Sequence, residues 1–152
     1  MKLNAFSRQV IETFPLGFVA TVTADGRPNV SPKGTFLVLD DETIAFGEIR
    51  SPVTLANLTH QPEVEVNFVD QWLRKGVRVR GVAQCAERGS DAFAELIPQW
   101  HAVWGDLAER VNVIVKIPVS SVRPLTTPPY DDGAIEEEMI ALYKMKFAEI
   151  FP

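Results

Sequence analysis

The chain has few residues of the kinds that cross-link proteins or bind metal ions. It contains a single cysteine, Cys85, and two histidines, His60 and His101, among 152 residues. One cysteine cannot close a disulfide within the chain, and two isolated histidines do not provide the ligand spacing of a zinc or iron site. The sequence therefore excludes a disulfide-stabilised scaffold, and we expect no metal site.

Long apolar runs and an excess of basic residues are also missing. The best apolar stretches, residues 17–22 and 111–119, are far shorter than the ~20 residues of a membrane-spanning helix. The first residues include Glu12 and lack the apolar core of a signal peptide. A formal charge of −5 disfavours nucleic-acid binding, which needs a basic surface. We expect a cytoplasmic protein without nucleic-acid or membrane partners.

The residues that are present suit one globular domain over residues 1–152. Hydrophobic residues make up 46% of the chain and charged residues 23%. Globular proteins average about 45–50% and about 25%. Because a chain of this length buries roughly two-thirds of its unfolded surface, it can form a hydrophobic core without cross-links.

Apolar periodicity and turn residues predict the secondary structure. Phe6, Val10 and Phe14 share one helical face, and Asp25-Gly26 suits a tight hairpin turn. We predict helices over 3–14, 51–61, 90–104 and 133–149, strands over 17–23, 29–39, 43–47, 63–69, 77–82 and 111–119, and a rigid loop over 124–129. Six strands, mostly at hairpin spacing, indicate a mainly β (α+β) fold, an antiparallel barrel with peripheral helices.

The segment from Glu48 to Thr54 carries the clearest chemical signal. A strand runs directly into a helix that starts after Ser51, so the N–H groups of the first helical turn are available to an anion. Arg50, Ser51 and Thr54 add further hydrogen-bond donors. The segment therefore predicts a phosphate site. A second interpretation, in which Ser51 only caps the helix and Arg50 is a solvated charge, stays open.

Three segments in order resemble one known family. They are PNVSPKG over residues 28–34, FGEIRSPVTLANL over 46–58 and NFVDQWLRKGVRVRG over 67–81. The series resembles the pyridoxamine 5'-phosphate oxidase-like superfamily of FMN-binding split barrels. The resemblance implies a split-barrel core over about 15–130, followed by the C-terminal helix that the residue pattern predicts over about 133–149, and a homodimer with FMN between the subunits.

The resemblance also implies a set of cofactor contacts. It places Lys33 near the N1 and C2 carbonyl of the flavin ring, where a cation would stabilise the reduced ring. Trp72, Arg74 and Lys75 would reach the cofactor across the dimer interface. The remaining contacts would be Val30, Ser31 and Pro32 at the edge of the ring, Gly47 and Glu48 along the cofactor, and Arg50, Ser51 and Thr54 on the phosphate.

The chain departs from the family pattern at the phosphate site. The oxidases have Ser-Arg-Lys where this chain has Ser51-Pro52-Val53, so Arg50 must compensate for two missing cations. Gly76 replaces a flavin-contacting glutamine, and the C-terminal arginine motif is absent. Vitamin B6 phosphate oxidation is therefore not expected. We predict an FMN-dependent oxidoreductase without a dedicated catalytic side chain; the alternatives are a flavin carrier without turnover, or an F420- or haem-binding split barrel.

Residues outside these segments have structural interpretations. Arg78 and Arg80 alternate with valines on one predicted strand, opposite acidic residues of its neighbour, which indicates cross-strand ion pairs. Trp100 and Trp104 lie four residues apart on one helical face and are typical of core or dimer packing.

Overall fold

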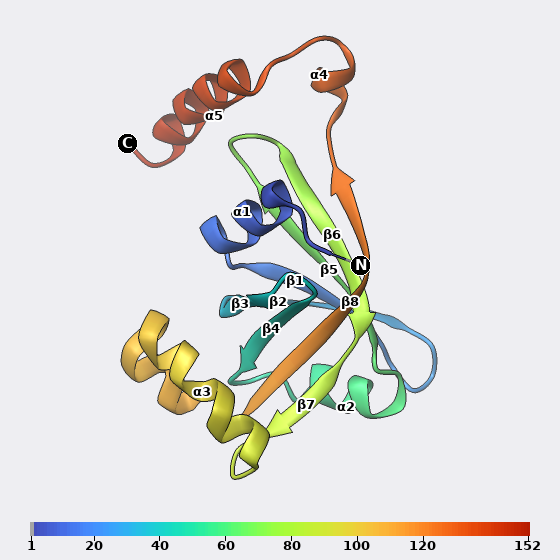
Figure 1. The fold of residues 1–152 in the computed structure, drawn as a ribbon. Helices are drawn as coiled ribbons and strands as arrows, with labels where there is room; N and C mark the ends of the chain where they lie inside the picture. The colour runs from blue at the N-terminus through green and yellow to red at the C-terminus, as the bar shows by residue number, and fades with distance from the viewer. Residues whose placement is uncertain (1) are drawn as a thin grey trace.

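The structure, a computed structural model, describes residues 2–152 as a curled antiparallel sheet with helices around it (Figure 1). The strands are Gly17–Val22 (β1), Pro28–Lys33 (β2), Phe36–Asp40 (β3), Thr43–Glu48 (β4), Glu63–Asp70 (β5), Lys75–Val82 (β6), Gln84–Glu87 (β7) and Val113–Leu125 (β8). The helices are Ala5–Thr13 (α1), Pro52–His60 (α2), Asp91–Trp104 (α3), the 3-10 helix Gly105–Arg110 (η1), Pro128–Asp131 (α4) and Glu136–Ile150 (α5).

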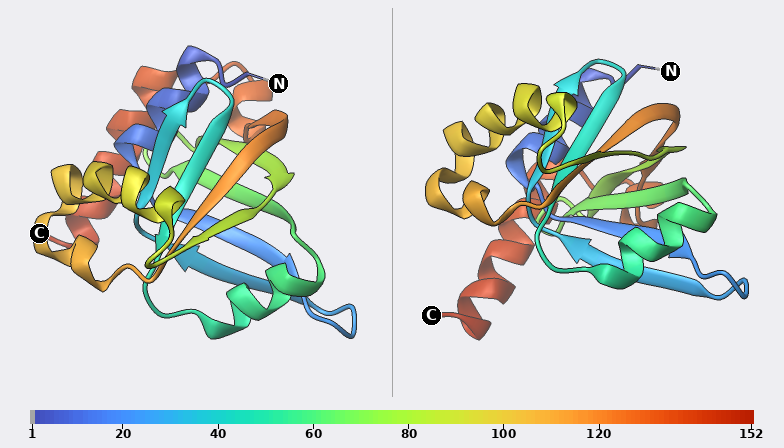
Figure 2. Two further views of the ribbon diagram at one scale, coloured as in Figure 1. Left: turned by 60° about the horizontal axis from the view of Figure 1, so that its bottom comes forward. Right: turned by 90° about the horizontal axis from the view of Figure 1, so that it is seen from below.

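Strand β8 joins the two halves of the sheet. The strand order is β2-β1-β5-β6-β8-β4-β3, with β7 also paired to β8. Residues 113–118 of β8 pair with β4, whereas residues 119–125 pair with β6. The β6–β8 register shifts between Arg80 and Gly81, an irregularity of the kind that bends a sheet. The sheet consequently curls into a split barrel (Figure 2), and the predicted fold class is confirmed.

Three details of the predicted secondary structure are wrong. The run expected over 29–39 is two strands, because the chain turns at Gly34 and Thr35, where Thr35 Oγ1 donates to the Gly47 carbonyl at 2.8 Å. The loop expected over 124–129 holds the end of β8 and the start of helix α4, since a proline in an extended strand loses only its N–H donor. Strand β7 has no predicted counterpart, because Ala86 is its one buried residue.

The other elements follow the prediction closely. Helix α3 begins after Ser90, whose Oγ accepts from the Phe93 N–H at 3.2 Å. Helix α5 starts three residues later than expected, after Gly133, whose φ of 91° interrupts helical geometry. The expected cross-strand pairing is confirmed: Arg80 lies 2.6 Å from Glu65, and Arg78 Nε donates to Asn67 Oδ1 at 3.1 Å.

The core has two parts, one inside the barrel and one beneath helix α3. Inside the barrel, the ring of Phe36 lies 5.1 Å from that of Phe46 and 4.8 Å from that of Phe68, between centroids. In the second part, Trp100 is fully buried among residues from α3, η1, β4 and β8, which confirms its predicted packing role. Burying a large apolar side chain stabilises a fold by about 1.5–3 kcal/mol, so these rings anchor the strands that carry the site.

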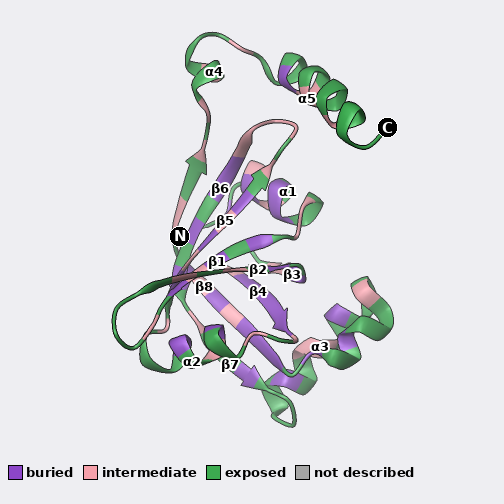
Figure 3. Ribbon diagram, turned by 180° about the vertical axis from the view of Figure 1, so that it is seen from behind, coloured by how far each residue is buried: buried purple, intermediate pink, exposed green. Residues whose placement is uncertain are grey.

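Helix α5 contributes little to either part of the core. It lies apart from the sheet, and only Met139 on it is buried (Figure 3). None of the helices within residues 2–152 combines the length and the hydropathy needed to cross a bilayer.

Candidate functional site

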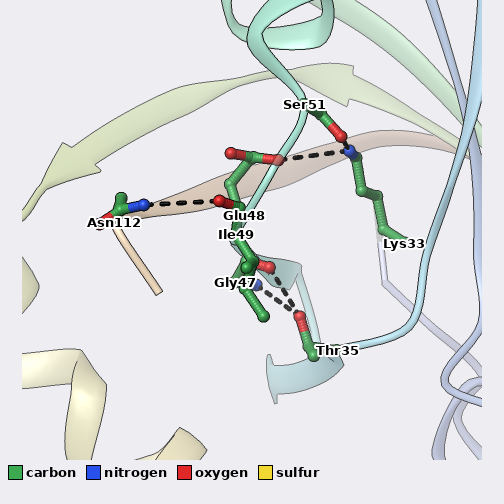
Figure 4. Close-up of polar contacts among 7 residues, drawn as sticks. All are labelled: Lys33, Thr35, Gly47, Glu48, Ile49, Ser51 and Asn112. Atoms are coloured by element: carbon green, nitrogen blue, oxygen red, sulfur yellow. Dashed lines mark hydrogen bonds and ion pairs between the residues drawn. The ribbon is translucent and has the colours of Figure 1, made fainter. Parts of the chain in front are cut away.

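The ends of β2 and β4 bring two charged side chains into the interior. Lys33 is the last residue of β2 and Glu48 the last of β4, and their side chains are only 6% and 4% exposed. Lys33 Nζ lies 3.4 Å from Glu48 Oε1 (Figure 4). Each charge needs the other, because an unpaired ion at this depth would be strongly destabilising. The pair therefore fixes both strand ends at the edge of the barrel.

The connection from β4 to α2 adds a third group to this pair. Ser51 Oγ accepts a hydrogen bond from Lys33 Nζ (Figure 4). Ser51 occupies the predicted N-cap position, but its side chain makes no cap hydrogen bond and its ψ is 70° rather than extended. The capping role predicted for Ser51 is thus wrong, since its hydroxyl is bonded to Lys33. The N–H groups of the first turn of α2 consequently lack a side-chain cap.

Burial and pairing act in opposite directions on Lys33. Loss of solvent lowers the pKa of the Lys33 ammonium below its ordinary value of 10.5, while the charge of Glu48 and its hydrogen bond raise it. Desolvation is the larger effect, so the pKa is lowered. A further negative charge placed beside Lys33 would therefore raise its pKa and favour the charged ammonium.

A cavity of about 330 Å³ opens beside this cluster. Two guanidinium side chains line it, Arg50 from the β4–α2 connection and Arg110 from the end of η1. Both residues are exposed, and neither forms an ion pair with a carboxylate of residues 2–152. The other lining residues are Pro32, Lys33, Gly34, Thr35, Gly47, Glu48, Ile49 and Ser51.

Arg110 is the lining residue that sequence reasoning missed. It ends the acidic segment GDLAER, far from the other lining residues in the chain. The chain between η1 and β8 places Arg110 at the cavity. Asn112 N, just before β8, donates to the Glu48 carbonyl at 2.9 Å, and this bond holds the start of β8 beside the end of β4. Nothing in the local pattern around Arg110 signals this position.

The floor of the cavity rests on the core beneath α3. Trp100 Nε1 donates to the Thr35 carbonyl at 2.9 Å, and Thr35 Oγ1 accepts from the Gly47 N–H at 3.1 Å. A Cβ on Gly47 would lie 2.9 Å from Val111 Cγ2 and 3.0 Å from Trp100 Nε1. Glycine is therefore required at position 47 by packing, independently of any ligand.

Half of the site residues predicted from the sequence meet at this cavity, namely Pro32, Lys33, Gly47, Glu48, Arg50 and Ser51. The structure places three others nearby but outside its lining. Val30 and Ser31 lie earlier in β2, where Val30 is 63% exposed, and Thr54 is buried in the first turn of α2.

The remaining three predicted residues lie at a different place, between the β5–β6 turn and α5. Trp72 packs against Phe147, with ring centroids 5.0 Å apart. The guanidinium of Arg74 lies 4.8 Å from the ring centroid of Tyr143. Lys75 Nζ forms an ion pair with Glu136 Oε1 at 3.0 Å in the same subunit. None of the three lines the cavity beside Lys33.

The sequence profile of the pyridoxamine 5'-phosphate oxidase family matches residues 3–128. Among solved structures, HupZ from Group A Streptococcus is 26% identical, with a TM-score of 0.70 over 82% of this chain and 95% of that chain. An FMN-binding protein from Syntrophomonas wolfei is 16% identical, with a TM-score of 0.65 over 80% and 85%. HutZ, the haem storage protein from Vibrio cholerae, is 21% identical, with a TM-score of 0.63 over 81% and 94%. No curated protein matches the chain.

Proposed function

The chain belongs to the pyridoxamine 5'-phosphate oxidase family, and on that premise we propose that it binds FMN and transfers hydride or electrons through it. The phosphate would lie in the cavity between β4, α2 and η1. FMN, when bound, would supply the redox chemistry, as cofactors of this class do. The protein would supply binding and electrostatics.

The observation that carries this proposal is the charge that lines the cavity. Lys33 and Glu48 neutralise one another, whereas Arg50 and Arg110 lack a carboxylate partner among residues 2–152. Two uncompensated guanidinium groups suit a phosphate ester, whose charge is roughly −1.5 to −2 near neutral pH. The uncapped first turn of α2 provides N–H donors of the kind that bind phosphate at helix N-termini. The residues present thus fit the phosphate of FMN.

Lys33 has a different part in the proposal from the two arginines. Its ammonium is held by Glu48 and Ser51, so its position in the cavity wall is fixed. A fixed cation beside a bound ring favours the ring when it gains negative charge, because the protein need not reorganise. Lys33 would therefore shift the redox potential of the bound cofactor, while Arg50 and Arg110 would set its affinity.

Titration with FMN and with riboflavin, followed by flavin fluorescence, tests the phosphate site. A hydrogen bond to a charged group contributes about 1.5–3 kcal/mol, so Arg50→Ala and Arg110→Ala should each weaken FMN binding by about ten- to hundredfold. Riboflavin, which lacks the phosphate, should bind the variants as it binds the wild type. Arg123→Ala is the control, since it removes an equal charge from an exposed residue that does not line the cavity. Equal losses for the two flavins would contradict the assignment.

A carrier that holds flavin without turnover is a second candidate. It is favoured because Glu48, the one carboxylate among the described lining residues, is already paired with Lys33, so the cavity wall offers no free general acid or base. Oxidation of NAD(P)H by the loaded protein separates the two: a carrier would show no rate above that of free FMN. Pro52 and Val53 stand where the oxidases have basic residues, so we do not propose vitamin B6 phosphate as the substrate.

F420 and haem are the competing ligands within the same fold. The described residues that line the cavity include no histidine, cysteine, methionine or tyrosine, the residues that hold haem iron. F420 carries a phosphate as FMN does, so the two arginines alone do not separate them. Competition between FMN and F420 for the wild-type protein measures which ring is preferred.

We also propose that the protein acts as a cytoplasmic homodimer. The outer face of the β1–β2 hairpin supports the dimer, because its apolar residues Phe18, Val22 and Val30 are 41%, 38% and 63% exposed. Phe18 pairs with Pro32 and Val22 with Pro28 across the two strands, so the apolar face is continuous and ends beside Lys33. Sedimentation velocity should give a dimer for the wild type and a monomer for Val30→Asp.

A further inference from the structure

Arg110 lines the cavity beside Lys33 from the last position of η1, where the chain turns toward β8. The last carbonyls of a helix have no partner within the helix. At the end of η1, the carbonyl of Glu109 lies just before Arg110 and that of the cap residue Val111 lies just after it. A group that binds both carbonyls would fix the backbone on each side of Arg110.

The side chain of Arg88 binds both carbonyls. Arg88 directly follows β7, and its Nη2 donates to the Glu109 carbonyl and, at 2.5 Å, to the Val111 carbonyl. Basic side chains near a helix C-terminus bind the last carbonyls in this way. Because one guanidinium nitrogen contacts both carbonyls, it spans the residue between them. Arg88 itself does not line the cavity.

Two further contacts hold Arg88 in place. Its guanidinium lies 5.8 Å from the ring centroid of Phe93, a residue of α3 that is only 8% exposed. A cation within about 6 Å of an aromatic ring centroid is attracted to the ring. The backbone N–H of Arg88 also donates to the Asn112 carbonyl at 2.9 Å. Arg88 is therefore bound through its backbone to the same stretch of chain that its side chain contacts.

Backbone hydrogen bonds fix the rest of segment 109–112. The Val111 N–H donates to the Ala108 carbonyl at 3.1 Å, and the Asn112 N–H donates to the Glu48 carbonyl at 2.9 Å. Each peptide group of the segment thus has at least one hydrogen bond, and the guanidinium supplies two of these bonds. Loss of the guanidinium would loosen the segment without removing any group from the cavity wall.

We propose that Arg88 is a positioning residue for Arg110: its two hydrogen bonds hold the backbone so that the Arg110 guanidinium meets an anion in the cavity. The consequence for phosphate affinity rests on the proposed function. A cation that is ordered before the ligand arrives binds more tightly than a mobile one, because less conformational entropy is lost on binding. Arg88 thus acts on affinity without touching the ligand.

Flavin titrations and hydrogen exchange of Arg88→Met test the proposal, since methionine keeps an apolar stem near Phe93 and removes both donors. The variant should bind FMN about tenfold more weakly, the ratio that ~1.4 kcal/mol produces, and riboflavin as tightly as the wild type. In an Arg110→Ala background, Arg88→Met should cause no further loss. Without flavin, the N–H groups of Val111 and Asn112 should exchange about tenfold faster, whereas those of β5 and β6 should not change.

Two other variants separate geometry from charge. Arg88→Lys keeps the positive charge but has a shorter side chain without the planar group, so it should recover only part of the FMN affinity. Arg123→Met removes an equal charge from an exposed residue that does not line the cavity. It should change neither the flavin affinities nor the exchange rates.

The positioning role alone is overturned if the wild type prefers FMN to riboflavin but Arg88→Met leaves that preference or the two exchange rates unchanged. It is also overturned if the losses from Arg88→Met and Arg110→Ala add, if Arg123→Met weakens FMN equally, or if Arg88→Lys restores full affinity while exchange stays fast. A wild type that binds FMN no more tightly than riboflavin overturns the phosphate site and, with it, the effect of Arg88 on affinity. That outcome is seen in the wild type alone, so the two failures are distinguishable.

Discussion

Removal of one member of the Lys33–Glu48 pair should destabilise the protein more than removal of both. The two charged atoms lie 3.4 Å apart with side chains 6% and 4% exposed. At an effective dielectric constant of about 20, charges at that distance attract one another by about 5 kcal/mol. The cost of taking both ions out of water offsets most of that attraction. The net contribution of the pair is therefore small, whereas the penalty for leaving one ion alone is large.

Lys33→Met should lower the free energy of unfolding by about 3–5 kcal/mol, because it leaves the Glu48 carboxylate buried without its cation. Glu48→Gln should also destabilise, although less, since Ser51 still accepts from the ammonium. The double variant should lose much less than the sum of the two single losses. Urea-induced unfolding at neutral pH, followed by circular dichroism, measures all four free energies under two-state conditions.

The exposed pair Arg80–Glu65 provides a matched control for this cycle. Its atoms are closer, at 2.6 Å, but the side chains are 51% and 35% exposed. Solvent screening limits such a pair to about 0.2–1 kcal/mol. If the Lys33–Glu48 cycle gives single losses that add within about 0.5 kcal/mol, burial does not couple the two ions and the reasoning is refuted.

Three further predictions concern single groups. Because burial lowers the pKa of Lys33 below 10.5, the unfolded chain binds more protons just below that pH, and the free energy of unfolding of the wild type should rise with pH there relative to Lys33→Met; a flat difference between their pH profiles would contradict this. Gly47→Ala should destabilise by about 1–3 kcal/mol, because its Cβ would lie 3.0 Å from Trp100 Nε1, and urea unfolding measures the loss. Partial loss of solvent and, to a lesser extent, Glu87 raise the pKa of the Cys85 thiol, so iodoacetamide should alkylate it more slowly than free cysteine at pH ~8. Glu87→Gln should speed that reaction only slightly; a large increase would make Glu87 the main cause.

Local patterns predicted most of the fold because each signal depends on neighbours in the chain. Phe6 and Val10 identify α1 through their helical spacing, and Ser90 identifies the start of α3 through its cap. The failures occur where a distant residue decides the structure. The bond from Thr35 to Gly47 divides the strand predicted over 29–39 into β2 and β3, and pairing with β8 makes Gln84–Glu87 a strand.

The residues of the candidate site could likewise be predicted only where neighbours in the chain determine them. Lys33, Arg50 and Ser51 could be found because they belong to short segments with a family pattern. The role of Ser51 could not, since its hydroxyl is bonded to a lysine on another strand rather than to its own helix. The role of Arg74 beside the cofactor of a second subunit stays a prediction. Within one chain, the Arg74 guanidinium lies 4.8 Å from the ring centroid of Tyr143 and its carbonyl accepts from Thr127 Oγ1, contacts that no local pattern signals.

Arg110 explains how an acidic chain can present a cationic cavity. All of the net charge of −5 comes from residues 86–152, because residues 1–85 carry equal numbers of acidic and basic side chains. Arg110 belongs to that acidic part, next to Glu109 in the sequence. The end of η1 turns its guanidinium into the cavity with Arg50, while helix α5, with Glu136, Glu137 and Glu138 in its first turn, lies apart from the sheet. At distances beyond a Debye length of about 8 Å those carboxylates are largely screened. Affinity for an anion therefore depends on the few charges that line the cavity, and the net charge of the chain does not predict it.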